Sequence, residues 1–225
     1  ARACPLQAMS TLCSVGMKTI GAAFQVDREF AEQLGLGTEH GLDAHVRPYI
    51  SGRDFVTRPR GFWVLDFFGM AEAALRARHP DCYQYLLDHA KPEREHNANA
   101  IFRRLWWVIG QPRPQFRAAT ARLSRYIVTV ETAKHRVFAF LPSEQVPDST
   151  LVTVASEDAA ALGVLQSTVH ETWALAAGGT LEDRPRYNKS VCFETFPFPS
   201  DDTGLTPTLT TRIRDLAEQL DAHRK

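Results

Sequence analysis

The chain has 225 residues, of which 44% are hydrophobic and 10% aromatic, and its formal net charge is zero. This composition predicts a folded core and excludes a disordered polar segment, and no apolar run approaches the roughly 20 residues of a membrane span. The first residues lack a secretory signal, so we expect a cytoplasmic protein with no membrane partner, and the initial Ala hints at a fragment of a longer polypeptide.

The first third of the chain predicts short strands joined by loops. Strands are expected at residues 6–9, 22–26, 46–50 and 61–67. Asp27 is expected to cap a helix that ends near Leu34, and a loop follows at residues 35–43. Residues 51–54, Ser-Gly-Arg-Asp, predict a turn after the third of these strands.

The middle of the chain changes to a helical pattern after Gly69. A helix is expected at residues 71–78, a second from Pro80 to about Ala90, and a third from Pro92 to Trp106 or Trp107. A short helix should then end near Leu123.

The last part of the chain predicts a hairpin and then a long helical region. Residues 126–130 and 136–141 alternate as strands around a loop at 131–135, and residues 151–155 form another strand. Residues 157–177 are mostly helical and stop at Gly178-Gly179, and residues 190–193 are the expected final strand.

This order mixes hairpins with inserted helices, so the predicted fold class is α+β, with mixed or antiparallel sheets and a carboxy-terminal helix. We expect one domain over residues 1–199, a linker at 200–207 and an amphipathic helix over 208–225. That helix either begins a further helical element or packs back on the domain. The aromatic and proline run at residues 193–199 is expected to anchor the end of the domain.

Motifs for catalysis are missing from the sequence. The chain has no Pro-Pro, which an amino-methyltransferase motif requires, and no Lys with an acid two positions before it, as common metal-dependent nucleases require. His170-Glu171 lacks a second His at position 174. Four scattered cysteines predict reduced core thiols and no zinc site. We therefore expect no catalytic residue, no metal and no cofactor in this chain.

Charge is segregated along the sequence although the total is zero. Residues 91–136 hold ten Lys and Arg against three acids, whereas residues 137–183 hold seven acids and no Lys or Arg. Such segregation predicts a local positive field, or alternatively helix faces whose charges balance in space.

Three loops combine cations with side chains that can contact base edges. The first cluster is Arg53, Arg58 and Arg60; the second is Lys134, His135 and Arg136, with Arg125 at the base of the preceding strand; the third is Glu182, Asp183, Arg184, Arg186, Asn188 and Lys189. Arg suits guanine, Asn suits adenine and an acid suits cytosine. Ordinary surface charge is the alternative for each cluster.

Other prominent residues favour structural roles. Trp106-Trp107 is more consistent with core than with a base-stacking platform, and His170 with a packed helix residue. The segment Lys91-Pro92-Glu93-Arg94-Glu95 predicts a helix start with local ion pairs, although Arg94 could reach a phosphate.

The order of motifs resembles the target recognition domain of MmeI-like type IIG (IIL) restriction–modification enzymes and related class I DNA methyltransferases, over roughly residues 6–200. The motifs that carry the resemblance are Arg58-Pro59-Arg60-Gly61-Phe62-Trp63, Lys91-Pro92-Glu93-Arg94-Glu95, Trp106-Trp107-Val108-Ile109-Gly110, Lys134-His135-Arg136-Val137-Phe138, His170-Glu171-Thr172-Trp173 and Phe193-Glu194-Thr195-Phe196-Pro197-Phe198-Pro199.

The resemblance implies that the chain recognises double-stranded DNA for an upstream adenine-N6 methyltransferase domain of the same polypeptide, which would use S-adenosylmethionine. It places base-discriminating positions near residues 132–136 and 180–189. We expect all three loops to line one DNA-binding face, with phosphate contacts from Arg58, Arg60, Arg125 and Lys189. The alternative is a protein-interaction or regulatory domain that uses the acidic residues 137–183.

Overall fold

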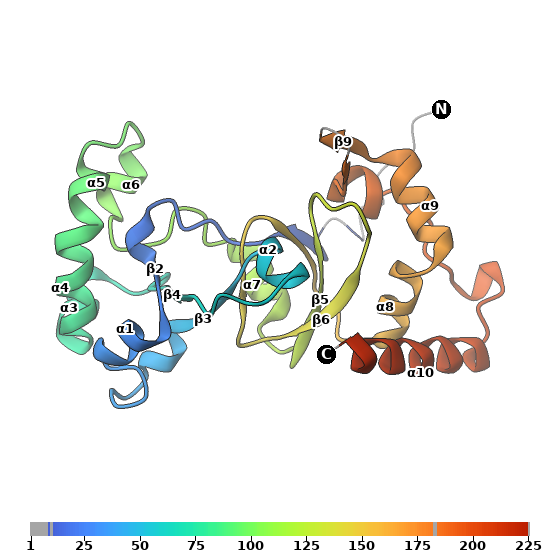
Figure 1. The fold of residues 1–225 in the computed structure, drawn as a ribbon, viewed down its shortest axis with the longest axis horizontal. Helices are drawn as coiled ribbons and strands as arrows, with labels where there is room; N and C mark the ends of the chain where they lie inside the picture. The colour runs from blue at the N-terminus through green and yellow to red at the C-terminus, as the bar shows by residue number, and fades with distance from the viewer. Residues whose placement is uncertain (1–8, 10, 182–183, 225) are drawn as a thin grey trace. The chain divides into compact units, whose positions relative to one another are not determined.

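The computed structural model describes residues 9, 11–181 and 184–224. It divides into two compact units. Figure 1 shows the helices and strands of both, coloured by residue number. The first unit comprises Ala1–Gly16, Pro114–Ser143 and Ser149–Lys225, and the second comprises Met17–Arg113 and Glu144–Asp148. Both units contain helices and a mixed or antiparallel sheet, so the α+β prediction is confirmed.

The first unit is built on a four-stranded antiparallel sheet. Its strand order is β1 (Cys13–Val15), β8 (Leu151–Val154), β5 (Arg125–Val130) and β6 (Phe138–Pro142). β5 and β6 form the predicted hairpin, in which Ile127 lies opposite Phe140 and Thr129 opposite Phe138. The loop of this hairpin carries the second cation cluster.

Helices of the first unit bury the apolar side chains of this sheet. They are α7 (Pro114–Thr120), α8 (Ala159–Leu165), α9 (Thr168–Ala177) and α10 (Pro207–Arg224). The core includes Ile127, Phe138, Leu162 and Phe193. As predicted, α9 ends at Gly178, whose backbone N–H bonds the carbonyl of Ala174.

The carboxy-terminal helix α10 packs against α8. Their backbones come so close at Gly163 that a Cβ there would lie 2.6 Å from Cγ2 of Ile213. The buried carboxylate of Asp221 in α10 also accepts a hydrogen bond from the backbone N–H of Phe140, at 2.9 Å. Of the two alternatives for this helix, the structure therefore has the one in which it packs back on the preceding fold.

The second unit holds a smaller sheet of four short strands. Its order is β2 (Gln25–Val26), β4 (Trp63–Leu65), β3 (Val46–Ile50) and β7 (Val146–Pro147), with β3 and β7 parallel. The helices of this unit are α1 (Arg28–Gln33), α2 (Gly52–Val56), α3 (Glu72–Arg78), α4 (Pro80–His89), α5 (Lys91–Glu95) and α6 (Ala100–Arg104). Asp27 caps α1 as predicted, because its side chain accepts a hydrogen bond from the Phe30 N–H.

Two predictions in the second unit were wrong. The helix expected from Pro92 to Trp107 is broken into α5 and α6, because the Asn97 and Asn99 side chains accept the backbone N–H groups of Asn99 and Ile101 and start a new helix. The turn expected at residues 51–54 is the start of α2, where Ser51 and Asp54 form a reciprocal capping box.

Two further strand predictions need correction, and a third lies almost entirely outside the described residues. Residues 189–193 form a π-helical turn (Lys189–Phe193), which Asn188 caps through the N–H of Ser190. Residues 22–24 are a 3₁₀ turn before β2. Of the strand expected at residues 6–9, residues 6–8 lie outside the described residues. Conversely, the supposed loop after Gly178 contains the strand pair β9 (Gly179–Leu181) and β10 (Arg184–Arg186). Within the described part of the chain, no helix combines the length and apolarity that a bilayer span requires.

Candidate nucleic-acid interface

The hairpin loop of residues 131–136 and strand β10 lie side by side in the first unit. The backbone N–H of Tyr187 donates to the carbonyl of Glu131 at 2.6 Å, and the N–H of Ala133 donates to the carbonyl of Pro185 at 3.3 Å. Thr132 and Arg186 form an antiparallel bridge between these bonds. The structure thus joins two clusters that the sequence separates by about 50 positions.

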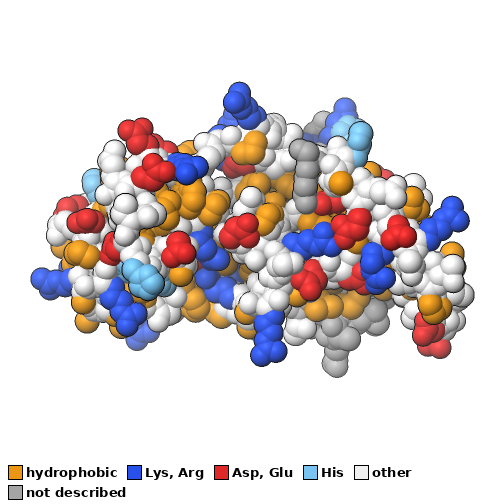
Figure 2. All heavy atoms as spheres, turned by 90° about the horizontal axis from the view of Figure 1, so that it is seen from below, with side chains coloured by type: hydrophobic (Ala, Val, Ile, Leu, Met, Phe, Trp, Pro, Cys, Tyr) orange, Lys and Arg blue, Asp and Glu red, His pale blue; other side chains and the backbone are white. Residues whose placement is uncertain are grey.

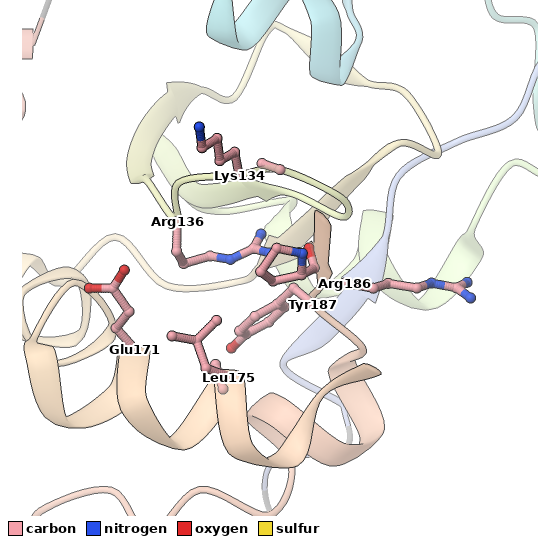
Figure 3. A pocket seen from close by; sticks show the side chains of 9 residues that line it. Lys134, Arg136, Glu171, Leu175, Arg186 and Tyr187 are labelled. Carbon is pink, nitrogen blue, oxygen red and sulfur yellow. The ribbon is translucent and has the colours of Figure 1, made fainter. Parts of the chain in front are cut away.

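A small pocket of about 50 Å³ opens where these two segments meet α9. Its lining comes from the hairpin loop, α9 and β10: Ala133, Lys134, Arg136, Glu171, Ala174, Leu175, Pro185, Arg186 and Tyr187. In Figure 3, the Arg136 side chain reaches toward Tyr187, whereas Lys134 and Arg186 extend away from the middle of the pocket. Cations therefore surround a pocket that also holds one carboxylate, that of Glu171.

Arg136 is buried, unlike its two neighbours in the loop. Its guanidinium donates to Oγ1 of Thr129 and to the carbonyl of Pro185, each at 3.2 Å, and also to the carbonyl of Val130. Burial lowers the pKa of this guanidinium. The Arg136 side chain therefore bonds groups of the fold. In the same loop, the side chains of Lys134 and His135 are exposed.

The exposed Arg186 pairs with Glu131 on the neighbouring loop. Its Nε and Nη2 lie 3.0 and 2.8 Å from Oε1 of Glu131, and the Arg186 side chain is 51% exposed. Exposed ion pairs contribute little to stability, because water solvates both groups nearly as well. Arg186 can therefore exchange this carboxylate for another acceptor at small cost. Arg184 is also exposed.

The remainder of the third cluster is only partly described. Lys189 lies at the start of the π-helical turn, with its Nζ 2.6 Å from Oε1 of the buried Glu194. Asn188 uses its side-chain oxygen to cap that turn. Glu182 and Asp183 lie outside the described residues.

Arg125 begins β5, and its side chain packs within the first unit. Its guanidinium lies 3.8 Å from the ring centre of Phe140, and its Nη1 donates to Oε2 of Glu218 in α10 at 3.0 Å. The carbonyl of Glu157 accepts a further bond, at 3.1 Å. The group expected to contact a phosphate is thus already held by an acid on a neighbouring helix.

The first cluster lies in the second unit, on and after α2. Arg53 and Arg58 are exposed there. Arg60 is also exposed, and it donates to the buried carboxylate of Asp54 through Nε at 2.7 Å and Nη2 at 3.0 Å. These bonds hold the pKa of Asp54 well below its usual range. Arg60 therefore fixes the segment that carries Arg53 and Arg58.

Tyr187, which lines the pocket, belongs to a buried aromatic cluster that the sequence alone did not reveal as part of the site. The Tyr187 hydroxyl lies 2.8 Å from Nε2 of His170 in α9, and both residues are almost fully buried. The rings of Phe196 and Phe198 pack beside His170, with centroids 4.4 and 6.4 Å away. The run at residues 193–199 is thus an anchor, as predicted. It packs against His170, which in turn bonds Tyr187 directly after β10. The signal in the sequence was Tyr187 itself, a residue with a large apolar ring between the polar Arg186 and Asn188.

Several structural predictions are confirmed, among them the helix start with a local ion pair at residues 91–95. Trp106 and Trp107 are core residues, and Cys192 is a buried thiol whose pKa burial raises. Arg94 cannot reach a phosphate, because it is 1% exposed and donates to the carbonyls of Thr19 and Ile20.

Charge on the face drawn in Figure 2 is mixed. Lys and Arg side chains alternate there with Asp and Glu rather than forming one basic patch.

The α+β fold presents two joined loops with exposed cations, an arrangement suited to a domain that recognises nucleic acid. The family model of the MmeI target recognition domain matches residues 2–200, and the chain belongs to this family. The resemblance read from the sequence motifs is therefore confirmed.

A solved structure of the type IIL restriction–modification enzyme MmeI in complex with DNA has a similar fold, with a TM-score of 0.75 and 19% sequence identity. The likeness covers 96% of this chain and 28% of the MmeI chain, so the chain spans little more than a quarter of that enzyme. No curated protein matches the chain.

Proposed function

We propose that the chain is the DNA sequence-recognition module of a restriction–modification enzyme, and that it reads bases with the loop of residues 131–136 and with residues 180–189. The observation that carries this proposal is the joining of these two loops by backbone hydrogen bonds. Two joined loops that carry Lys, His and Arg side chains suit the hydrogen-bond acceptors that base pairs present in the major groove.

The side chains of the two loops have different roles in this proposal. Arg184 and Arg186 contact base edges, and Glu131 holds Arg186 in position until DNA replaces it. Glu182 and Asp183 belong to the same reading loop. Lys134, His135 and Lys189 contact bases or phosphates, and Arg53 and Arg58 contact phosphates from the second unit.

Arg60, Arg125 and Arg136 support the interface from within. Each is bonded inside its own unit, to Asp54, to Glu218 and to the two joined loops respectively. In place of the phosphate and base contacts expected for them, we assign them the task of fixing the segments that carry the exposed cations.

The parent enzyme belongs to the same proposal. A target recognition domain needs a catalytic partner, and the chain accounts for 28% of a protein such as MmeI. We infer that an upstream domain of the same polypeptide transfers a methyl group from S-adenosylmethionine to adenine N6, after the base has been flipped out of the duplex. An Asn-Pro-Pro-Phe or Asn-Pro-Pro-Tyr motif upstream in the open reading frame would support this inference, and its absence would contradict it.

Salt dependence of binding tests the DNA contact directly. In the intact polypeptide, Lys134→Ala should weaken binding to all duplexes alike and reduce the slope of log K against log salt by about 1, because one phosphate contact is lost. Arg212→Ala is the matched control: it removes an exposed cation from α10, which lies at the other end of the first unit from β9 in Figure 1. Equal effects of the two changes would contradict the assignment. Binding to a protein but not to DNA would favour the regulatory alternative.

A further inference from the structure

Arg136 lies at the base of the hairpin loop and touches both reading loops at once. It is 9% exposed, and its guanidinium bonds Thr129 and Val130 on β5 together with Pro185 on β10. The guanidinium carbon also lies 5.1 Å from the centre of the Tyr187 ring. One side chain thus bridges two segments through polar contacts and through an aromatic face.

The other side-chain link between the loops is weaker. The ion pair of Arg186 with Glu131 is exposed, so water competes with it. The backbone bonds of Ala133 and Tyr187 connect the segments over a few residues only. The buried guanidinium of Arg136 therefore adds a side-chain hydrogen bond, shielded from water, to the backbone bonds that join the hairpin loop to β10.

Arginine is the side chain suited to this position. Its planar group offers five donors in a rigid fork, so it can serve carbonyls on two segments at once, whereas a lysine ammonium is a single compact centre. Removing the fork would take a donor from the buried carbonyl of Val130 and leave the carbonyl of Pro185 with the N–H of Ala133.

We propose that Arg136 is a positioning residue that joins the loop of residues 131–136 to β10, so that both loops present their base contacts as one unit. The inference rests on the proposed function, and it assigns to Arg136 no contact with DNA. A change at Arg136 then alters reading by both loops together, whereas a change at an exposed residue alters reading by its own side chain.

The first test needs no DNA. In Arg136→Met, hydrogen exchange of the Ala133 and Tyr187 amides should speed up by about tenfold or more, while the Ile127 and Val128 amides in β5 stay protected. Arg136→Lys, which keeps the charge and the fold, should give an intermediate rate. Lys134→Met, which removes a neighbouring exposed cation, should leave the exchange rates of the Ala133 and Tyr187 amides unchanged. Equal exchange in wild type and Arg136→Met would overturn the inference.

The second test measures base preference by selection from randomised duplexes with the intact polypeptide. Arg136→Met and Arg136→Lys should weaken preference at two or more base pairs together, with Lys the milder. Arg184→Ala should weaken preference at one base pair. Loss of preference at a single base pair in the Arg136 variants would overturn the inference. If the wild type itself enriches no sequence, the proposed function fails, whereas enrichment by the wild type with an unchanged Arg136→Met profile contradicts the positioning role alone.

Discussion

At the scale of single residues, the arginines of this chain divide by what their guanidinium groups contact. Arg60, Arg94, Arg125 and Arg136 bond acids or carbonyls within their own unit. Arg94 and Arg136 are buried, whereas Arg60 is exposed, as are Arg53, Arg58 and Arg184. A cation count along the sequence cannot separate these groups, because an Arg at a loop base and one at a loop tip look alike until the partner segment is known.

Asp54 gives a stability prediction at this scale. Asp54→Asn should lower the free energy of unfolding at neutral pH by about 1–3 kcal/mol, because it removes a charged partner of Arg60 and half of the α2 capping box. The pKa of Asp54 is lower in the folded chain than in the unfolded one, where it is about 3.9. The contribution is therefore complete above about pH 4 and is lost below it.

Urea unfolding of wild type and Asp54→Asn at pH 7 and pH 3 checks this prediction. The difference between the two proteins should shrink at pH 3. An equal or larger difference at the lower pH would show that the carboxylate charge does not stabilise α2.

His170 gives a second prediction, in a different pH window. Burial, with a smaller contribution from the nearby charge of Arg136, lowers its pKa to about 4 from an unfolded value near 6.5. Between pH 6.5 and 4 the unfolded chain binds a proton that the folded chain does not, so stability falls as the pH falls. The loss is of the order of 3 kcal/mol over the whole window.

His170→Phe keeps a ring beside Tyr187 and Phe196 and removes the titration. Thermal or urea unfolding at pH 7, 6, 5 and 4.5 should show a shallower decline for His170→Phe than for wild type. Tyr187 loses its hydroxyl partner in the variant, which lowers stability at every pH and leaves the slope unaffected. Parallel declines in the two proteins would contradict the assignment.

At the scale of elements, local chemistry predicted the parts that depend on neighbouring residues. Asp27 capped α1, Pro80 began α4, and the alternation on either side of residues 131–135 gave the β5–β6 hairpin. The π-helical turn at residues 189–193 was mistaken for a strand, since a short apolar run has no period long enough to separate the two.

The sequence predicted which segments of the chain form the candidate site. It did not predict the contacts that join these segments. Residues 131–136 and 180–189 were selected from charge and loop placement, yet the bond from Arg136 to Pro185 spans 49 positions. No local pattern announces such a contact. The support by His170 and the 193–199 run is equally nonlocal, because it depends on how α9 packs over the aromatic rings.

Gly178 provides the test at the scale of elements. A Cβ at this position would lie 2.7 Å from the carbonyl oxygens of both Ala174 and Arg186, so glycine lets β10 approach the end of α9. Gly178→Ala should destabilise the protein by about 1–3 kcal/mol, because backbone has to move. It should also weaken DNA binding through displacement of β10.

Gly179→Ala is the matched control, since nothing lies within 4 Å of a Cβ there. Its effect on unfolding should stay within about 0.5 kcal/mol. Similar losses in the two variants, measured by chemical denaturation, would contradict the close approach.

At the scale of the whole molecule, the chain is two α+β units, and the first of them holds the two joined reading loops. The second unit contributes Arg53 and Arg58 on an element fixed by Arg60 and Asp54. Arg60, Arg125 and Arg136 each bond a group of their own unit, and these bonds hold the segments that carry the exposed cations.

Selection of bound sequences from a library of randomised duplexes tests the central claim most directly, with the intact polypeptide as wild type and as Arg184→Ala. The wild type should enrich one short sequence, and Arg184→Ala should lose preference at one base pair, at a cost of about 1–3 kcal/mol, while the others stay fixed. An unchanged profile in the variant, or a wild type that enriches no sequence, would contradict the claim that residues 180–189 read DNA.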